Sequence, residues 1–226
     1  MGNECSVSFN ENKQWLKCLV AVNVHVRDAL LEVLHILGGI PSDPQRLYDF
    51  FADKKQQDKI KDLVKKKVLS ADQVALLFPQ NQRTFSSKWD ITLICVVIIN
   101  FSNLPPPTNG WFKPLDVGDI SVAASVVAAR QELRNRLNHG TADDFKDEKV
   151  FRPFWSKVEN SLNTFKYTKM NEFQNLESGD VDLTIFAFQI DKFMNDVGTA
   201  DKKEITLEVL NWLQNDNKKS KIFQVI

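Results

Sequence analysis

The stretch Arg134–His139, RNRLNH, gathers the residue types that acid–base chemistry on a phosphate requires. Histidine is the side chain whose ordinary pKa lies nearest to neutrality, so His139 can act as a general base or acid. Arginine keeps its charge and matches phosphate oxygens, so Arg134 can stabilise a developing negative charge. In RNA cleavage, the 2′-hydroxyl attacks the adjacent phosphate, and these two groups suit that step. A nearby asparagine such as Asn135 can orient the histidine or hold the phosphate.

Helix geometry limits how this stretch can work. On a regular helix Arg134 and His139 point about 140° apart. Gly140 indicates that the helix ends at His139. We therefore expect His139 to unwind and swing toward the face that carries Arg130, Arg134 and Asn138, which follow at intervals of four.

A structural interpretation competes with this catalytic one. Arg130, Arg134 and Arg136 would merely cover a helix end, and His139 would be a C-terminal group of the kind that the helix dipole favours. Local chemistry alone favours the structural interpretation. Convergence of the Arg134 and His139 side chains in an open groove that solvent reaches would support the catalytic one, and burial of His139 against the core would support the structural one.

The spacing of apolar residues predicts an all-α protein. Sustained alternation typical of strands is absent except for a doubtful few residues at 181–188. Pro79 and the three prolines of LPPPTNGWFKP separate helices. The expected helices span 15–37, two segments within 41–69, a segment that begins after Ser70, and 91–103, 120–138, 145–165, 181–194 and 202–214. Gly38 and Gly39 stop the first of them. The expected caps are a capping box of Ser70 and Gln73, Asp90 for 91–103, and Asp116 or Asp119 for 120–138.

Composition excludes several classes of protein. The 226 residues are 43% hydrophobic, which suits a folded globular chain, and 29 basic residues balance 29 acidic ones. Overall charge therefore does not indicate binding to nucleic acid or anionic membrane. The lysines at 54, 55, 59, 61 and 65–67 are interleaved with aspartates, so a solvated surface is a better interpretation than RNA contact. Phosphate-binding glycine loops are absent.

The remaining reactive residue types point to packing. Cys5, Cys18 and Cys95 have no CxxC spacing, which suits reduced thiols in a cytosolic setting. His25 and His35 lie within the first helix without metal-ligand spacing, so both are interpreted as packed helix residues. No metal site is expected.

The N-terminal stretch MGNECS fits the myristoylation pattern, with Gly2 as the acylated residue and Cys5 as a second lipidation position. A chance match is the alternative. Without lipidation we expect a cytoplasmic protein, because the longest apolar stretch, 91–101, is far shorter than the about 20 residues of a membrane helix.

The motif and its surroundings resemble a known family. Arg134, Asn135 and His139 match the R-x4-6-H signature of the HEPN superfamily (higher eukaryotes and prokaryotes nucleotide-binding). The ordered segments KKKVLSADQVALLFP, WDITLICVVIINF, LPPPTNGW, RNRLNHG and FRPFWSKVENSL resemble the animal HEPN subfamily found in a DAZ-interacting, RNA-binding ubiquitin ligase and in some innate-immunity receptors. The likeness covers about Trp15 to Lys166.

This resemblance implies an all-α helical bundle at 15–170, after an N-terminal segment 1–14 and before a C-terminal extension 171–226. It implies a homodimer with one composite, metal-independent and cofactor-free site that cleaves single-stranded RNA. Catalysis would fall to Arg134, Asn135 and His139, and RNA binding to Arg130, Arg136 and Asn138.

Two alternatives remain open. The family also contains members that do not cut RNA, so the chain can be a dimerisation or interaction module with protein partners in an innate-immune or RNA-regulatory assembly. The motif can also belong to a generic core helix whose polar residues have no function.

Overall fold

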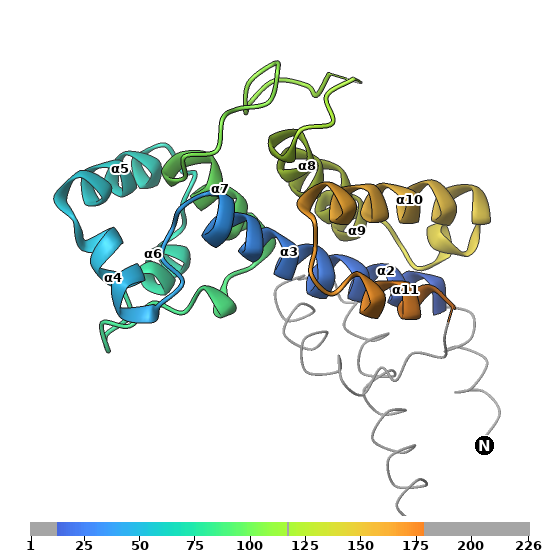
Figure 1. Cartoon of the computed structure of the whole chain (residues 1–226), viewed down its shortest axis with the longest axis horizontal. Helices are drawn as coiled ribbons and strands as arrows, with labels where there is room; N and C mark the ends of the chain where they lie inside the picture. The colour runs from blue at the N-terminus through green and yellow to red at the C-terminus, as the bar shows by residue number, and fades with distance from the viewer. Residues whose placement is uncertain (1–12, 117, 179–226) are drawn as a thin grey trace, which may run out of the picture. The chain divides into compact units, whose positions relative to one another are not determined.

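A computed structural model describes residues 13–116 and 118–178 of the chain (Figure 1). These residues form helices and loops without a strand, which confirms the predicted all-α class. The described residues belong to two compact units, which are treated separately below. The first unit comprises residues 13–25, 135–158 and 169–178, and the second comprises residues 26–134 and 159–168.

Several predictions fall on the other residues. The helices expected at 181–194 and 202–214, the doubtful strand at 181–188 and the lipidation positions Gly2 and Cys5 lie outside the described residues. The domain boundaries at 14 and 170 stay a prediction. Among the described helices, none combines the length and apolar character needed to cross a membrane.

The elements follow the predicted order closely. Those with π-helical geometry are η1, η2 and η4, and η3 and η5 are 3-10 turns. In chain order the elements are α2 (Lys13–Val20), η1 (Ala21–Val26), α3 (Arg27–Glu32), η2 (Val33–Leu37), α4 (Pro44–Ala52), α5 (Lys54–Lys65), α6 (Ala71–Leu77), η3 (Ser86–Lys88), α7 (Ile91–Phe101), α8 (Val122–Ala128), η4 (Ala129–Arg134), α9 (Asn135–His139), η5 (Asp143–Lys146), α10 (Glu148–Phe165) and α11 (Met170–Ser178).

Glycine stops the first helical run where the sequence predicts it. The Gly38 amide donates to the Val33 carbonyl oxygen at 2.8 Å, and a Cβ at Gly38 would lie 2.6 Å from the Leu34 carbonyl oxygen. Gly39 then takes a left-handed conformation with φ of 70°, which glycine adopts without steric cost. The π-helical geometry of η1 and η2 was not predicted.

Side-chain caps begin the predicted helices. The Ser70 hydroxyl accepts from the Gln73 amide at 3.2 Å, and the Gln73 side chain accepts from the Ser70 amide at 3.0 Å, which completes the expected capping box. Asp90 accepts from the Leu93 amide at 2.7 Å at the start of α7. Each cap satisfies backbone donors that have no partner within the helix.

The expected cap of α8 is wrong. Ser121, and neither Asp116 nor Asp119, begins this helix, and its hydroxyl accepts from the Ala124 amide at 3.1 Å. Asp119 instead accepts from the amides of Thr108, at 2.7 Å, and Ser121, at 2.9 Å. Its carboxylate therefore ties Thr108, within the loop that joins α7 to α8, to the residues directly before α8.

Helix α7 forms the centre of the second unit. Elements α3, η2 and η4 pack against it. Its buried residues face in all directions around the axis, as expected of a helix that is apolar all round. They are Ile91, Leu93, Ile94, Cys95, Val96, Val97, Ile98 and Phe101.

Aromatic rings form the core of the first unit. The rings of Trp155 and Phe173 stack with centroids 4.9 Å apart, and Phe145 meets Phe154 edge to face at 5.2 Å. The predicted apolar face of α10, including Phe151 and Val158, is buried. Phe173 comes from α11, a helix that was not predicted.

The two histidines of the first helical run are structural, as predicted. His25 is buried and packs edge to face against Phe173 at 5.8 Å. His35 is half-buried, with Nδ1 2.9 Å from the Ile40 carbonyl oxygen and Nε2 3.0 Å from the Ser86 hydroxyl. His35 thereby joins the end of its helix to the η3 turn.

Burial of His25 predicts that stability depends on pH. Desolvation, with a further contribution from the charge of Lys169, lowers the pKa of His25 to about 4. Unfolding returns this pKa to about 6.5, so the unfolded chain binds more protons between these values. The free energy of unfolding should therefore fall by about 2 kcal/mol from pH 7 to pH 5 through this group alone. Urea unfolding at both pH values measures the change.

The matched variant is His25→Gln, which removes the titrating ring. Its loss of stability between pH 7 and pH 5 should be smaller than that of the wild type by about 2 kcal/mol. Equal losses would contradict the assignment. An NMR titration of the wild-type imidazole provides a second readout if the variant does not fold.

Candidate functional site

The motif lies at the end of a helical run formed by α8, η4 and α9. The alanines and valines that precede it are buried, including Ala123, Ala124, Val126, Val127 and Ala129. Element η4 packs against α7 within the second unit. Small side chains allow the backbones of neighbouring helices to approach closely, so this run serves as a packing surface and its polar residues project elsewhere.

Arg130 and Arg134 lie on the side of η4 near Cys95 of α7. Burial raises the pKa of the Cys95 thiol to about 12, and the positive charges of Arg130 and Arg134 act against this rise. Both arginines are half-buried. Their spacing of four was expected to place them on one face, and the shared influence on Cys95 agrees with that expectation.

His139 is exposed at the last residue of α9. The Gly140 amide donates to the Arg136 carbonyl oxygen at 2.8 Å, so the helical hydrogen-bond pattern continues to this point. The expected unwinding at His139 is therefore wrong. The chain passes from the second unit to the first between Arg134 and Asn135, and the convergence of Arg134 with His139 stays a prediction.

The other candidates differ in exposure. Asn135 and Asn138 are half-buried on α9, and Arg136 is exposed. The positive charge of Arg136 reaches Asp144, which lies in the turn after the motif. A predicted RNA-binding arginine thus has a carboxylate in its neighbourhood.

Gly140 is needed because a side chain at this position would collide with its neighbours. Its backbone is not left-handed. Among the glycines that the structure describes, positive φ values occur at Gly39 and Gly110. A Cβ at Gly140 would lie 2.7 Å from the Arg136 carbonyl oxygen and 3.2 Å from a ring carbon of Phe145. The absence of a side chain therefore lets the chain turn tightly against Phe145 directly after His139.

A reciprocal pair of hydrogen bonds fixes the turn after Gly140, and it was not predicted. The Thr141 amide donates to an Asp144 carboxylate oxygen at 2.8 Å, and the Asp144 amide donates to the Thr141 hydroxyl at 3.3 Å. The hydrogen bond from the Thr141 amide holds the pKa of Asp144 below its usual range, and the positive charge of Arg136 makes a smaller contribution in the same direction. The sequence T-x-x-D at 141–144 has the capping-box pattern and could have revealed this turn.

A comparison with protein families identifies the chain. The family model described as DZIP3/hRUL138-like HEPN matches residues 44–187. The chain belongs to this HEPN family. The match includes the whole motif, Arg134–His139, together with α4 to α11, and it confirms the resemblance inferred from the sequence. Comparisons with curated proteins and with solved structures found no significant match.

The tight turn at Gly140 predicts a measurable loss of stability in Gly140→Ala. The added methyl group would overlap the Arg136 carbonyl oxygen, so the turn must open. The free energy of unfolding should fall by about 1–3 kcal/mol, as it does when atoms are forced into a filled space. Urea unfolding measures the loss.

Gly118→Ala is the matched control. A Cβ there would come no closer than 3.7 Å to Asp116 Oδ1, which is an ordinary contact. Its stability should stay within about 0.5 kcal/mol of the wild type. An equal loss in the two variants would contradict the role given to Gly140.

Proposed function

We propose that this HEPN domain cleaves single-stranded RNA without a metal ion, at a site formed by the motifs of two copies of the chain. Arg134, Asn135 and His139 are its catalytic residues. The observation that carries the proposal is the exposure of His139 at the end of α9, in a chain that belongs to the HEPN family. A histidine held in the core would be out of reach of a polymer substrate.

The reaction needs one base, one acid and a positive charge. His139 of one copy removes the proton of the 2′-hydroxyl, and the 2′-oxygen attacks the adjacent phosphorus. The bond from phosphorus to the 5′-oxygen breaks, and that oxygen takes a proton from the partner's His139. The products are a 2′,3′-cyclic phosphate and a 5′-hydroxyl. Arg134 stabilises the added charge on the phosphorane, and Asn135 orients the histidine.

Two copies resolve the angular conflict within one helix. On an ideal α-helix, residues five positions apart point about 140° apart, and in that geometry Arg134 and His139 of one chain would not face the same phosphate. When two motifs meet, Arg134 of one copy can face the partner's His139. The arrangement also supplies the second histidine that acid–base catalysis requires.

RNA binding is assigned to Arg130, Arg136 and Asn138, which flank the catalytic residues on the same helical run. Arg136 is the exposed member of the three. A phosphate bound to it competes with the carboxylate of Asp144 for the guanidinium. Because such contacts release counterions from the nucleic acid, binding should weaken as salt rises.

The first test measures cleavage of a fluorescent single-stranded RNA in the presence of a metal chelator. The wild type should generate cyclic phosphate ends, and His139→Ala should lower the rate by at least about 100-fold because it removes the acid–base group. RNA affinity, measured separately by anisotropy, should change little in this variant. Arg46→Ala, which removes an exposed arginine of α4, is the matched control and should keep full activity.

Cleavage by His139→Ala at the wild-type rate would overturn the catalytic assignment. A wild type that binds no RNA and cleaves none, yet forms a stable oligomer, would favour the alternative of an interaction module.

The second test asks whether the site is composite. Arg134→Ala and His139→Ala homodimers should each be inactive. Mixing the wild type with an excess of the double variant Arg134→Ala/His139→Ala, under conditions that exchange subunits, should abolish most of the activity. A heterodimer of the two holds neither a second histidine nor an arginine that faces the intact one. Native mass spectrometry confirms that exchange has occurred. Heterodimers that keep about half of the wild-type activity would show that Arg134 and His139 act within one chain.

A further inference from the structure

A groove runs along the surface of the second unit, between α5 and α6. Its volume is about 370 Å³. Its lining is mostly apolar, with polar groups on the α5 side. The lining residues are Gln57, Ile60, Lys61, Val64, Val74 and Phe78.

The apolar part of the groove remains open to solvent. Ile60 is buried in its floor, whereas 41% of the surface of Val64 is exposed. Val68, which follows α5, is 37% exposed. Phe78 is fixed by an edge-to-face contact with Tyr48, with centroids 6.1 Å apart. The groove is thus preformed, and covering it would remove apolar surface from water.

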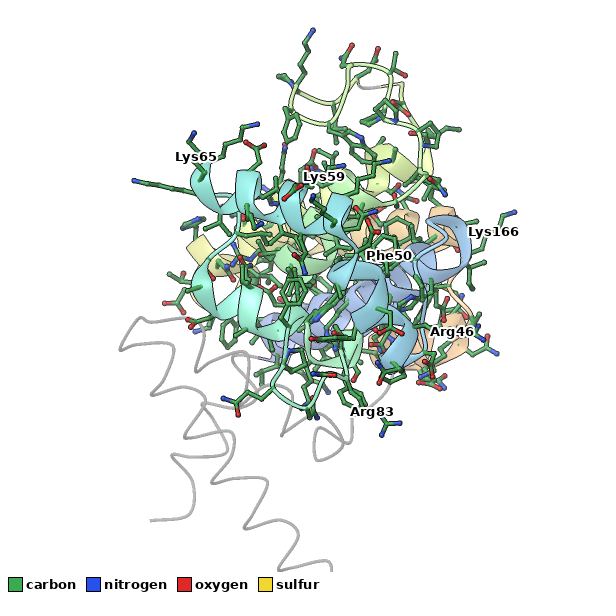
Figure 2. The ribbon with its side chains drawn as sticks, turned by 90° about the vertical axis from the view of Figure 1, so that its left-hand side faces the viewer. Arg46, Phe50, Lys59, Lys65, Arg83 and Lys166 are labelled. Carbon is green, nitrogen blue, oxygen red and sulfur yellow. The ribbon has the colours of Figure 1, made fainter. Side chains whose placement is uncertain are left out.

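Lys61 lines one edge of this groove, and further lysines of α5 lie on the same side of the helix. Lys54, Lys61 and Lys65 are spaced by seven and four residues on α5, so their directions lie within about 40° of one another. Lys61 forms an ion pair with Asp58 at 3.4 Å, between two exposed side chains. Residues 53–78 contain seven lysines against four aspartates, and Figure 2, which views this side, shows Lys65 at the outer end of α5. The edge is therefore positively charged beside an apolar floor.

We propose that this groove binds an amphipathic helix of another protein, with apolar residues along one face and Asp or Glu along one edge. Both walls are helices whose backbone groups are paired, so no strand edge is available for an added strand. Nucleic acid would use the lysines but would leave the apolar floor uncovered. A helix with apolar residues at i, i+3, i+4 and i+7 uses both features at once. The surface is distinct from the motif and independent of RNA cleavage.

The test uses a fluorescein-labelled synthetic peptide of about 18 residues, long enough to form a helix. It carries leucine at the i, i+3, i+4 and i+7 positions and glutamate along one edge. A second peptide has lysine in place of each glutamate. Anisotropy titrations with the full chain should show saturable binding of the acidic peptide and at least about tenfold weaker binding of the basic one.

Variants of α5 distinguish binding in the groove from non-specific attraction between the peptide and the lysines. Val64→Asp should abolish binding, because it places a charge on the apolar floor. Lys61→Glu combined with Lys65→Glu should weaken binding of the acidic peptide by at least about tenfold. Lys55→Glu is the matched control, since Lys55 points about 180° away from Val64 on the same helix, and it should bind as the wild type does. Circular dichroism confirms that each variant is folded.

Three outcomes would overturn the proposal. They are absence of binding by the acidic peptide, equal binding of both peptides, and binding that Val64→Asp leaves unchanged. Sedimentation of the peptide-free protein tests whether a second copy of this chain occupies the groove instead. If Val64→Asp converts a dimer into a monomer, the groove is an interface between copies of this chain and not a site for another protein.

Discussion

Helix α7 is apolar except at Thr92 and Asn100, and most of its side chains are buried within the second unit. Each Leu, Ile or Val side chain that is fully buried contributes about 1.5–3 kcal/mol, whereas an exposed ion pair contributes at most about 1 kcal/mol. The packing of α3, η2 and η4 against α7 therefore decides this part of the fold. The helical run that carries the motif is positioned by the same surface, because its alanines and valines face the core while Arg130 and Arg134 remain at its edge.

Features decided within a few residues were predictable from the sequence. The caps at Ser70 and Asp90 and the stop at Gly38 depend on side chains and amides that are near neighbours in the chain. The cap of α8 was not predictable in this way. Asp119 had the right chemistry, but its carboxylate bonds the amide of Thr108 across the loop, which leaves Ser121 to begin the helix.

Features decided by distant contacts were missed. The pattern of α11 is short, and its place depends on Phe173 stacking on Trp155 of another helix. At the candidate site, the sequence identified the family correctly, but the expected unwinding of His139 is wrong. The sequence did not reveal why Gly140 is needed, because the constraint comes from the Arg136 carbonyl oxygen and the ring of Phe145, against which a Cβ would collide. The π-helical geometry of η4 likewise depends on packing that apolar periodicity does not reveal.

The burial of Cys95 has a consequence for chemical reactivity. Its sulfur lies 3.7 Å from the Val126 carbonyl oxygen inside the second unit, and the pKa of its thiol is raised to about 12. Only the thiolate attacks an alkylating reagent, so the folded protein protects this atom by both enclosure and protonation. Cys95 can therefore be alkylated only when α7 and α8 separate. The alkylation rate measures how often this part of the second unit unfolds locally.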